Sequence, residues 1–181
     1  MIVGVTGASG SIYAQRLLAV VPKDYEIHLV VSDNGEKVAL YELGKHWLPK
    51  RKLIRHRSND FFAPIASGSF KTLGMVIVPC SMGTVGGVAG ALSQNLLQRA
   101  ADVCLKERRK LVLVPRETPY STIHLKNMHT LSLAGAVILD ANPPFYQRPK
   151  SLHDIVDAIV GRILDQFEIE HRLTQEWKGK K

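Results

Sequence analysis

The feature that most constrains the fold is a repeated alternation of short apolar runs with segments of helical periodicity. The runs are continuous and rich in branched residues, as in strands buried on both faces, and they lie at residues 2–5, 27–31, 75–78, 111–114 and 136–139. Helical spacing follows them at residues 12–20, 40–41, 85–106, 122–133 and 151–167. This order predicts an α/β fold, a doubly wound parallel sheet of Rossmann-like or flavodoxin-like type with helices on both faces. Residues 49–69, basic and then rich in turn formers, are predicted to be an irregular connection.

Length and composition fit one domain of this kind. The chain has 181 residues, of which 45% are hydrophobic and 22% charged, values typical of a soluble globular protein. We expect a single domain over residues 1–181, with a tail at 174–181 that is either disordered or docked on a neighbouring subunit. No apolar run reaches the roughly 20 residues of a membrane span, and the first ten residues lack a signal pattern. A cytoplasmic protein with reduced, structural Cys80 and Cys104 is therefore expected.

The charge balance indicates an anionic partner. Lys and Arg number 24 against 16 Asp and Glu, a formal net charge of +8, which suits phosphate, nucleic acid or acidic lipid. The run Lys106–Lys110 lies at the end of a predicted helix, where cations favour the helix dipole, and aromatic residues are not interleaved with it. We therefore expect neither nucleic acid nor membrane as the partner. The histidines form no metal-binding pattern, and no metal site is predicted.

Polar turns follow the predicted strands, where ligands bind in such sheets. The turn Thr6–Gly10 (TGASG) offers two hydroxyls and backbone N–H groups to a phosphate on the N-terminus of the next helix. Its glycine spacing is that of neither the dinucleotide fingerprint nor the Walker loop. The turn 79–84 (PCSMGT) has a similar character, and the next turn places Arg116 beside Glu117, either at a ligand or as an exposed pair. Asp33 either caps a helix or grips a ribose.

Taken together, these segments resemble the flavin prenyltransferases of the UbiX family over almost the whole chain. The matching segments, in order, are TGASG at 6–10, APIASGS at 63–69, PCSMGT at 79–84, LLQRAADVCLKERRKLVLVPRETP at 96–119 and FYQRP at 145–149. The resemblance implies transfer of a dimethylallyl group from dimethylallyl monophosphate to N5 and C6 of reduced FMN, without a metal. The product would serve UbiD-type decarboxylases. The resemblance also implies a homo-oligomer, a homododecamer, with sites where subunits meet.

Roles follow for individual residues from the same resemblance. The implied FMN contacts are Gly7, Ala8, Ser9, Ser32, Ser67, Ser81, Met82, Gly83, Thr84, Arg99 and Arg116. The implied groups around the dimethylallyl phosphate are Lys106, Arg116, Tyr146 and Arg162, with Trp177 closing over the site. The implied catalytic residues are Ser9, Glu42, Glu117 and Lys106. Whether a carboxylate or the departed phosphate removes the C6 proton is left open.

Two features depart from the family pattern, and one related activity competes with the first. Asp33–Gly35 stands where relatives commonly have a lysine, and Phe61 and Phe62 stand where some have tryptophan, so the accepted prenyl length is open. The competing activity is an FMN-dependent cysteine decarboxylase of the same superfamily, which shows a P-A-S-A-N-T loop and a catalytic histidine. Here the loop is PCSMGT, and no histidine lies in a matching motif.

Overall fold

Six parallel strands form one sheet in the computed structural model, which describes residues 1–174 and 179. In chain order the strands are β1 (Ile2–Val5), β2 (His28–Val31), β3 (Ile54–His56), β4 (Gly74–Cys80), β5 (Lys110–Pro115) and β6 (Val137–Ile138). Their spatial order is β3-β2-β1-β4-β5-β6. The order reverses between β1 and β4, which pair from Ile2 opposite Met75 to Gly4 opposite Ile77. In doubly wound sheets a ligand crevice opens at this reversal, beyond the carboxyl ends of the strands.

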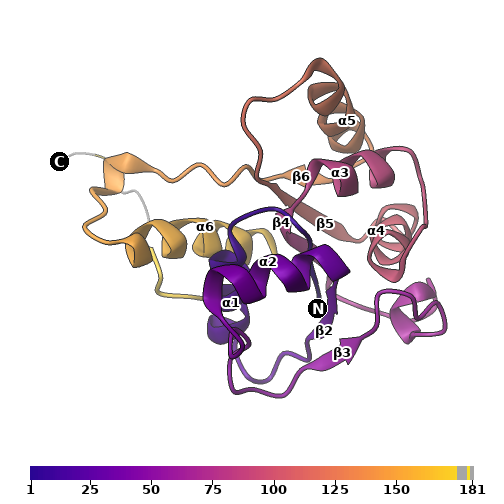
Figure 1. Ribbon diagram of the computed structural model, residues 1–181, viewed down its shortest axis with the longest axis horizontal. Helices are drawn as coiled ribbons and strands as arrows, with labels where there is room; N and C mark the ends of the chain where they lie inside the picture. Colours follow the sequence, from indigo (N-terminus) through magenta and orange to yellow (C-terminus); the bar gives the residue numbers. More distant parts are fainter. Residues whose placement is uncertain (175–178, 180–181) are drawn as a thin grey trace.

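Helices cover both faces of the sheet, as the sequence predicts (Figure 1). Alternate strand residues point to opposite faces, so Val3 and Val5 pack in one core cluster while Ile2 packs in the other. The first cluster is covered by α1 (Ser11–Val20), α2 (Asp33–Leu43) and α6 (Leu152–Gln166). The second is covered by α3 (Met82–Ala89), α4 (Leu96–Lys106) and α5 (Thr122–Leu133). The predicted helical stretch 85–106 is thus two helices, and Asn95 caps the second through the Gln98 N–H at 2.9 Å.

The predicted irregular connection at 49–69 contains a strand, β3, and a short 3-10 helix, η1 (Pro64–Ala66). The sequence did not reveal β3 because it is an edge strand of three residues whose central side chain, that of Arg55, is exposed. Side chains help to fix it, since Arg55 Nη2 donates to Glu36 Oε2 at 2.7 Å and His56 Nε2 lies 2.9 Å from His28 Nδ1. The prediction of an irregular segment is therefore wrong for these residues.

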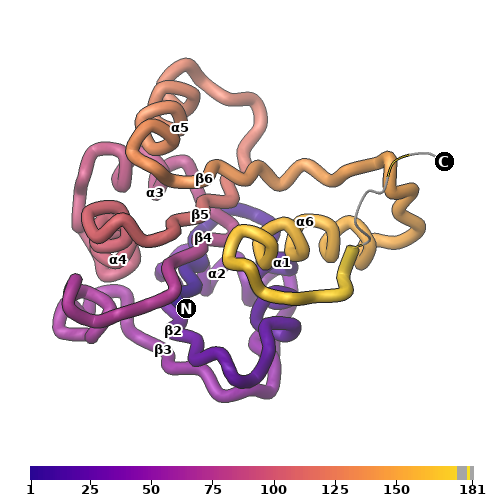
Figure 2. The backbone as a smooth tube through the Cα atoms, turned by 180° about the vertical axis from the view of Figure 1, so that it is seen from behind, coloured from indigo at the N-terminus to yellow at the C-terminus, as the bar shows by residue number. Residues whose placement is uncertain are grey.

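An extended arm, which we define as residues 139–150, leaves the body of the molecule between β6 and α6 (Figures 1 and 2). It carries a second 3-10 helix, η2 (Phe145–Gln147), with exposed aromatic side chains at Phe145 and Tyr146. The chain then returns along α6, which is tied to α1 by Arg16 Nε and Asp157 Oδ1 at 2.6 Å. Most of the arm thus lies away from the core clusters.

Two further sequence predictions concern the state of the cysteines and the presence of a membrane-spanning segment. Cys80 and Cys104 are both buried and free, and burial raises the pKa of the Cys104 thiol to about 12. Within residues 1–174 and 179, no helix is long and apolar enough to cross a membrane.

Candidate functional site at the carboxyl ends of the strands

Thr6 joins the two strands that flank the crevice. Its buried hydroxyl donates to the Pro79 carbonyl at 2.9 Å and accepts from the Ser81 N–H at 2.7 Å. The Thr6 N–H also donates to the Pro79 carbonyl, at 3.2 Å. The sequence predicted that this hydroxyl faces a phosphate, which is wrong because both of its hydrogen bonds are made inside the protein. Thr6 is instead a structural link that fixes the first and third turns relative to each other.

The Glu42 carboxylate occupies the N-terminus of α1. Its oxygens accept from the Gly10 N–H at 3.1 Å and from the Ser11 N–H at 2.8 Å, and Gly10 has a φ of +112°, which favours glycine. Burial acts to raise the pKa of Glu42, but hydrogen bonds from the Ser9 hydroxyl and these N–H groups outweigh it, so the pKa is lowered. The structure therefore places a protein carboxylate where the sequence predicted a ligand phosphate.

The other two helices that begin at the crevice are capped by serines. Ser32 Oγ accepts from the Gly35 N–H at 3.0 Å at the start of α2. Ser81 Oγ lies 3.1 Å from Thr84 Oγ1 and accepts from the Thr84 N–H at 3.4 Å at the start of α3. Asp33 is the first residue of α2, whose first turn is acidic, whereas α3 has no acidic residue in its first turn. The N-terminus of α3 is therefore better suited to an anion than those of α1 and α2.

The first turn lies tightly against α2. A Cβ built on Gly7 would fall 2.7 Å from Asn34 Cβ, which is closer than real Cβ atoms approach. Gly7 therefore lies against Asn34 in the first turn of α2. This close approach explains a glycine at position 7.

Arg116 extends from the end of β5 to the first turn. Its Nε donates to the Ser9 carbonyl at 3.1 Å, and its backbone N–H donates to the Cys80 carbonyl at 3.3 Å. Glu117 is exposed, and its Oε1 accepts from the Thr118 N–H at 3.0 Å. The structure therefore brings Arg116 into the crevice, while the Glu117 carboxylate is held at its own turn.

The loop that contains Ser67 is held against α4 by two arginines. Arg99 Nε donates to the Ala66 carbonyl at 3.1 Å, and Arg109 donates to the carbonyls of Phe70, at 2.7 Å, and Gly68. Ser67 Oγ lies 2.9 Å from Ser69 Oγ. The sequence analysis did not identify Arg109, because this residue lies within a basic run, Lys106–Lys110, and its acceptors are 39 and 41 residues away along the chain.

Three residues implied at the dimethylallyl phosphate lie elsewhere within a single chain. Lys106 ends α4 and pairs with Glu107, close to the start of β5. Arg116 follows the other end of β5, about 17 Å of strand away. Tyr146 lies on the arm, and Arg162 lies on α6 with its Nη1 3.0 Å from Asp165 Oδ2. Trp177 and most of the predicted docking tail lie outside the described residues.

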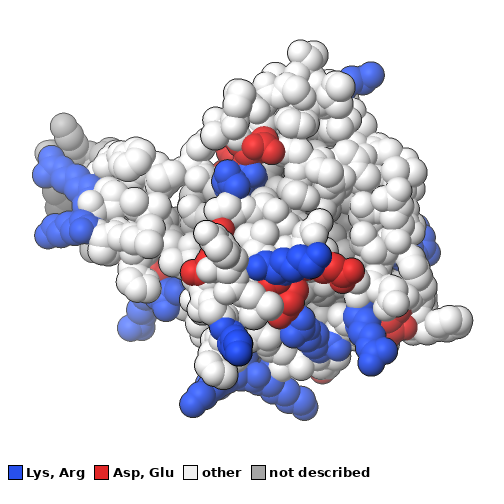
Figure 3. Space-filling view, in the orientation of Figure 1, with Lys and Arg blue, Asp and Glu red and all other residues white. Residues whose placement is uncertain are grey.

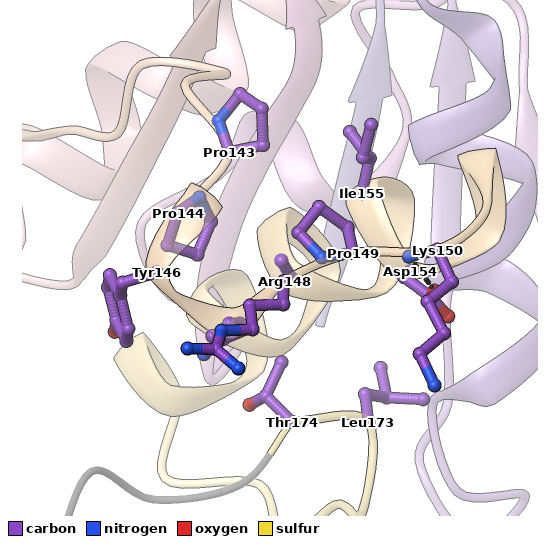
Figure 4. Close-up of a pocket in the computed structure, with 12 residues that line it drawn as sticks. Pro143, Pro144, Tyr146, Arg148, Pro149, Lys150, Asp154, Ile155, Leu173 and Thr174 are labelled. Atoms are coloured by element: carbon purple, nitrogen blue, oxygen red, sulfur yellow. Dashed lines mark hydrogen bonds between the residues drawn. The ribbon is translucent and has the colours of Figure 1, made fainter.

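Two pockets flank these regions. One, of about 610 Å³, lies at the carboxyl ends of β2 and β3 and includes Ser32, Asp33 and His56, so it adjoins the crevice. The other, of about 510 Å³, lies between the arm and α6, with Tyr146 and Arg148 toward one end and Lys150 and Leu173 toward the other (Figure 4). Among the residues that the structure describes, no group of three or more His, Cys, Asp or Glu side chains is arranged to hold a metal ion.

Comparisons with known proteins point to one family. Residues 1–164 match the sequence profile of the family described as Flavoprotein. The chain is 47% identical to a protein of Halalkalibacterium halodurans named flavin prenyltransferase UbiX, with 97% of this chain and 91% of that protein covered. A dodecameric FMN-dependent UbiX-like decarboxylase from Escherichia coli O157:H7 is 42% identical, with a TM-score of 0.92 over 98% of each chain. The crystal structure of AnUbiX with FMN and dimethylallyl pyrophosphate is 41% identical, with a TM-score of 0.92 over 99% of this chain and 97% of that one.

Proposed function

The chain belongs to the flavoprotein family and within it to the flavin prenyltransferases, so it is a transferase that acts on FMN. From this premise we propose that it transfers a dimethylallyl group from dimethylallyl monophosphate to N5 and C6 of reduced FMN. The observation that carries this proposal is the similarity, 47% and 45% identity over 97% and 98% of this chain, to two proteins named flavin prenyltransferase UbiX. A UbiD-type decarboxylase receives the prenylated product.

The crevice fits the flavin on its own chemistry. Backbone N–H groups at the start of α3, with no acidic side chain in the first turn, suit an anionic group of reduced FMN. A Cβ on Gly83 would meet nothing within 4 Å, so this turn leaves open space beside it. Arg116, whose side chain bonds to the Ser9 carbonyl and whose backbone N–H bonds to the Cys80 carbonyl, adds a positive charge beside this turn. Ser9, Ser32, Ser81 and Thr84 supply hydroxyls at the same edge.

We further propose that the phosphate end of the donor is bound by neighbouring copies of this chain. Lys106, Tyr146 and Arg162 lie away from the crevice of their own chain, and a relative from Escherichia coli is dodecameric. The surface over α3 and α5 suits packing between copies, because it shows few charged side chains (Figure 3) and exposes Ile123, Leu125 and Leu133 of α5. In the assembly the site then combines a crevice from one copy with basic groups from others.

In this arrangement the protein residues stabilise the leaving phosphate and handle protons. The allylic C–O bond breaks as N5 attacks, and Lys106, Arg116, Tyr146 and Arg162 supply positive charge and donors to the departing phosphate. The lowered pKa keeps Glu42 ionised as an acceptor for the Ser9 hydroxyl, so this pair orients the hydroxyl beside the flavin. In the ring closure the allyl double bond takes up one proton while its carbon bonds to C6, and C6 loses another proton, for which Glu117 and the departed phosphate are the candidate bases.

The decisive experiment is an anaerobic incubation of the protein with reduced FMN and dimethylallyl monophosphate, followed by mass analysis of the released flavin. A gain of one C5H8 unit is the expected result, and a matched sample without donor is the control. Comparison of Glu42→Gln with Glu117→Gln then ranks the two carboxylates. Unmodified flavin together with decarboxylation of a peptidyl or pantothenoyl cysteine would favour the competing activity.

Subunit mixing tests the shared site. When Lys106→Ala and Glu117→Gln variants are each inactive, co-assembled oligomers regain about one quarter of the wild-type activity if the two residues reach one site from different copies. No recovery in verified mixed oligomers would place both residues in one chain's site.

A further inference from the structure

One side-chain hydrogen bond links the turn after β5 to the base of the arm. The ring of Tyr120 packs against the core cluster beneath α3 and α5, and its hydroxyl donates to Asp140 Oδ1 at 2.8 Å. Tyr120 follows the Arg116–Glu117 turn by three residues, and Asp140 follows β6 by two. The bond thus joins a wall of the crevice to the segment that leaves the body of the molecule.

Asp140 organises the first residues of the arm. Besides the Tyr120 hydroxyl, its carboxylate accepts from the Ala141 N–H at 3.0 Å and from Asn142 Nδ2 at 2.5 Å. The preceding residue, Leu139, makes a sheet bond, its N–H donating to the Leu113 carbonyl at 2.8 Å. The direction in which the arm leaves the sheet is therefore set at Asp140.

The turn is fixed at both of its ends and at Tyr120. Arg116 bonds to the carbonyls of Ser9 and Cys80, and Ser121 caps α5 by accepting from the His124 N–H at 3.2 Å. Between them, Tyr120 is the point at which a side chain ties the turn to a distant part of the chain. Glu117 lies near enough to contribute to the electrostatics of the Tyr120 hydroxyl.

We propose that Tyr120 and Asp140 are paired positioning residues, whose hydrogen bond sets the Arg116–Glu117 turn and the arm that carries Tyr146 relative to each other. This inference rests on the proposed function, because the turn serves the crevice of its own copy while the arm presents Tyr146 to a neighbour. The Tyr120–Asp140 hydrogen bond therefore links the positions of Arg116 and Glu117 in one site to the position of Tyr146 in the site of a neighbouring copy.

The chemistry of the pair suits a permanent link. Burial, the hydrogen bond to Asp140 and the charges of Asp140 and Glu117 raise the pKa of Tyr120 to about 12. The phenol therefore stays protonated and remains a hydrogen-bond donor to Asp140 at any pH at which the enzyme would be assayed. Hydrogen bonds to charged groups are among the stronger ones in proteins.

Tyr120→Phe tests the pair, because it removes the hydroxyl and keeps the ring in its packing. We expect kcat for flavin prenylation to fall about tenfold, the size of effect that follows from losing one hydrogen bond to a charged group. The dissociation constant of FMN changes by less than about twofold, because Arg116 and Ser81 keep their own bonds. Tyr25→Phe, on a ring packed against the other core cluster, is the matched control and leaves kcat unchanged.

Two further variants separate positioning from general weakening. Asp140→Asn keeps an oxygen that can accept from the Tyr120 hydroxyl, so it retains more activity than Asp140→Ala. The double variant of Tyr120→Phe with Asp140→Ala is no slower than Asp140→Ala alone, because the two changes remove one shared interaction. Additive losses, or equal losses of kcat and FMN affinity, would overturn the positioning role.

Hydrogen exchange tests the link independently of catalysis. In the FMN-bound oligomer, Tyr120→Phe speeds amide exchange both at Thr118 and Tyr120 and at Ala141, whereas Tyr25→Phe does not. Faster exchange at only one of these segments, or at neither, would refute the coupling. If the wild-type protein transfers no prenyl group, the proposed function fails, and the exchange measurement still decides whether the two segments are linked.

Discussion

Replacement of Thr6 by valine tests whether the link between β1 and β4 holds the crevice together. The change keeps the shape of the buried side chain but removes the hydroxyl that bonds Pro79 and Ser81. The partly buried Ser81 N–H loses an acceptor at 2.7 Å, at a cost of about 1–3 kcal/mol for a donor left unsatisfied. The Pro79 carbonyl keeps the Thr6 N–H, so its lost second bond costs about 1 kcal/mol. The free energy of unfolding should therefore fall by about 3 kcal/mol.

Thr6→Ser is the matched control, because it keeps both hydrogen bonds and removes only a buried methyl group, at a cost of about 1 kcal/mol. The two variants are compared with the wild type by urea unfolding at one subunit concentration, since assembly makes stability depend on concentration. Flavin titration adds a second readout. Thr6→Val weakens FMN binding because Ser81 caps α3, while Thr6→Ser binds FMN nearly as well as the wild type.

The outcome that would refute this reasoning is a Thr6→Val protein at least as stable as Thr6→Ser. The hydroxyl would then contribute less than a methyl group, and the fixed geometry of the first and third turns would need another cause.

Three further predictions concern other parts of the molecule. Glu42→Gln removes a charge from the N-terminus of α1 and lowers the free energy of unfolding by about 1 kcal/mol at neutral pH. Because folding lowers the pKa of Glu42, the urea midpoints of the variant and the wild type should converge as the pH falls through the lowered pKa. A difference that stays constant with pH would contradict the charge effect. Gly7→Ala places a Cβ 2.7 Å from Asn34 Cβ, so FMN affinity falls about tenfold or more while far-UV circular dichroism stays unchanged; unchanged affinity would show that the turn can shift freely. Burial and the charge of His28, opposed by Asp60, lower the pKa of His56, so the unfolded chain binds this proton at a higher pH than the folded protein. The urea midpoint should therefore decrease as the pH is lowered from about 7.5 to about 5.5. The midpoint of His56→Gln should decrease less over this range, and an equal decrease would refute the assignment.

The sequence predicted the elements that carry a strong local signal. Five strands were found because each is a continuous apolar run, and the helices because their apolar residues recur at helical spacing. β3 was missed because Ile54, Arg55 and His56 show no such pattern and an edge strand needs only one partner. The turns of the site could be predicted as well, because parallel strands bring their carboxyl ends to one edge.

Which groups the turns offer to a ligand could not be predicted in the same way. Thr6 and Ser9 are both hydroxyl residues of one turn, yet the Thr6 hydroxyl is bonded inside the protein while Ser9 is exposed. Likewise Lys106 and Arg116 lie ten residues apart and were both assigned to one phosphate, but Lys106 precedes the start of β5 and Arg116 follows its end, so they lie at opposite ends of this strand.

The sequence by itself thus determined the fold class, the order of the five apolar strands and the helices, and the family, because periodicity and motifs are local properties of the chain. Only the tertiary structure decided which polar groups meet. Gly10 and Glu42 are 32 residues apart, Thr6 and Ser81 are 75 apart, and Ser9 and Arg116 are 107 apart. Pairs at such separations are brought together by strand order and helix packing, and no local pattern in the chain encodes them.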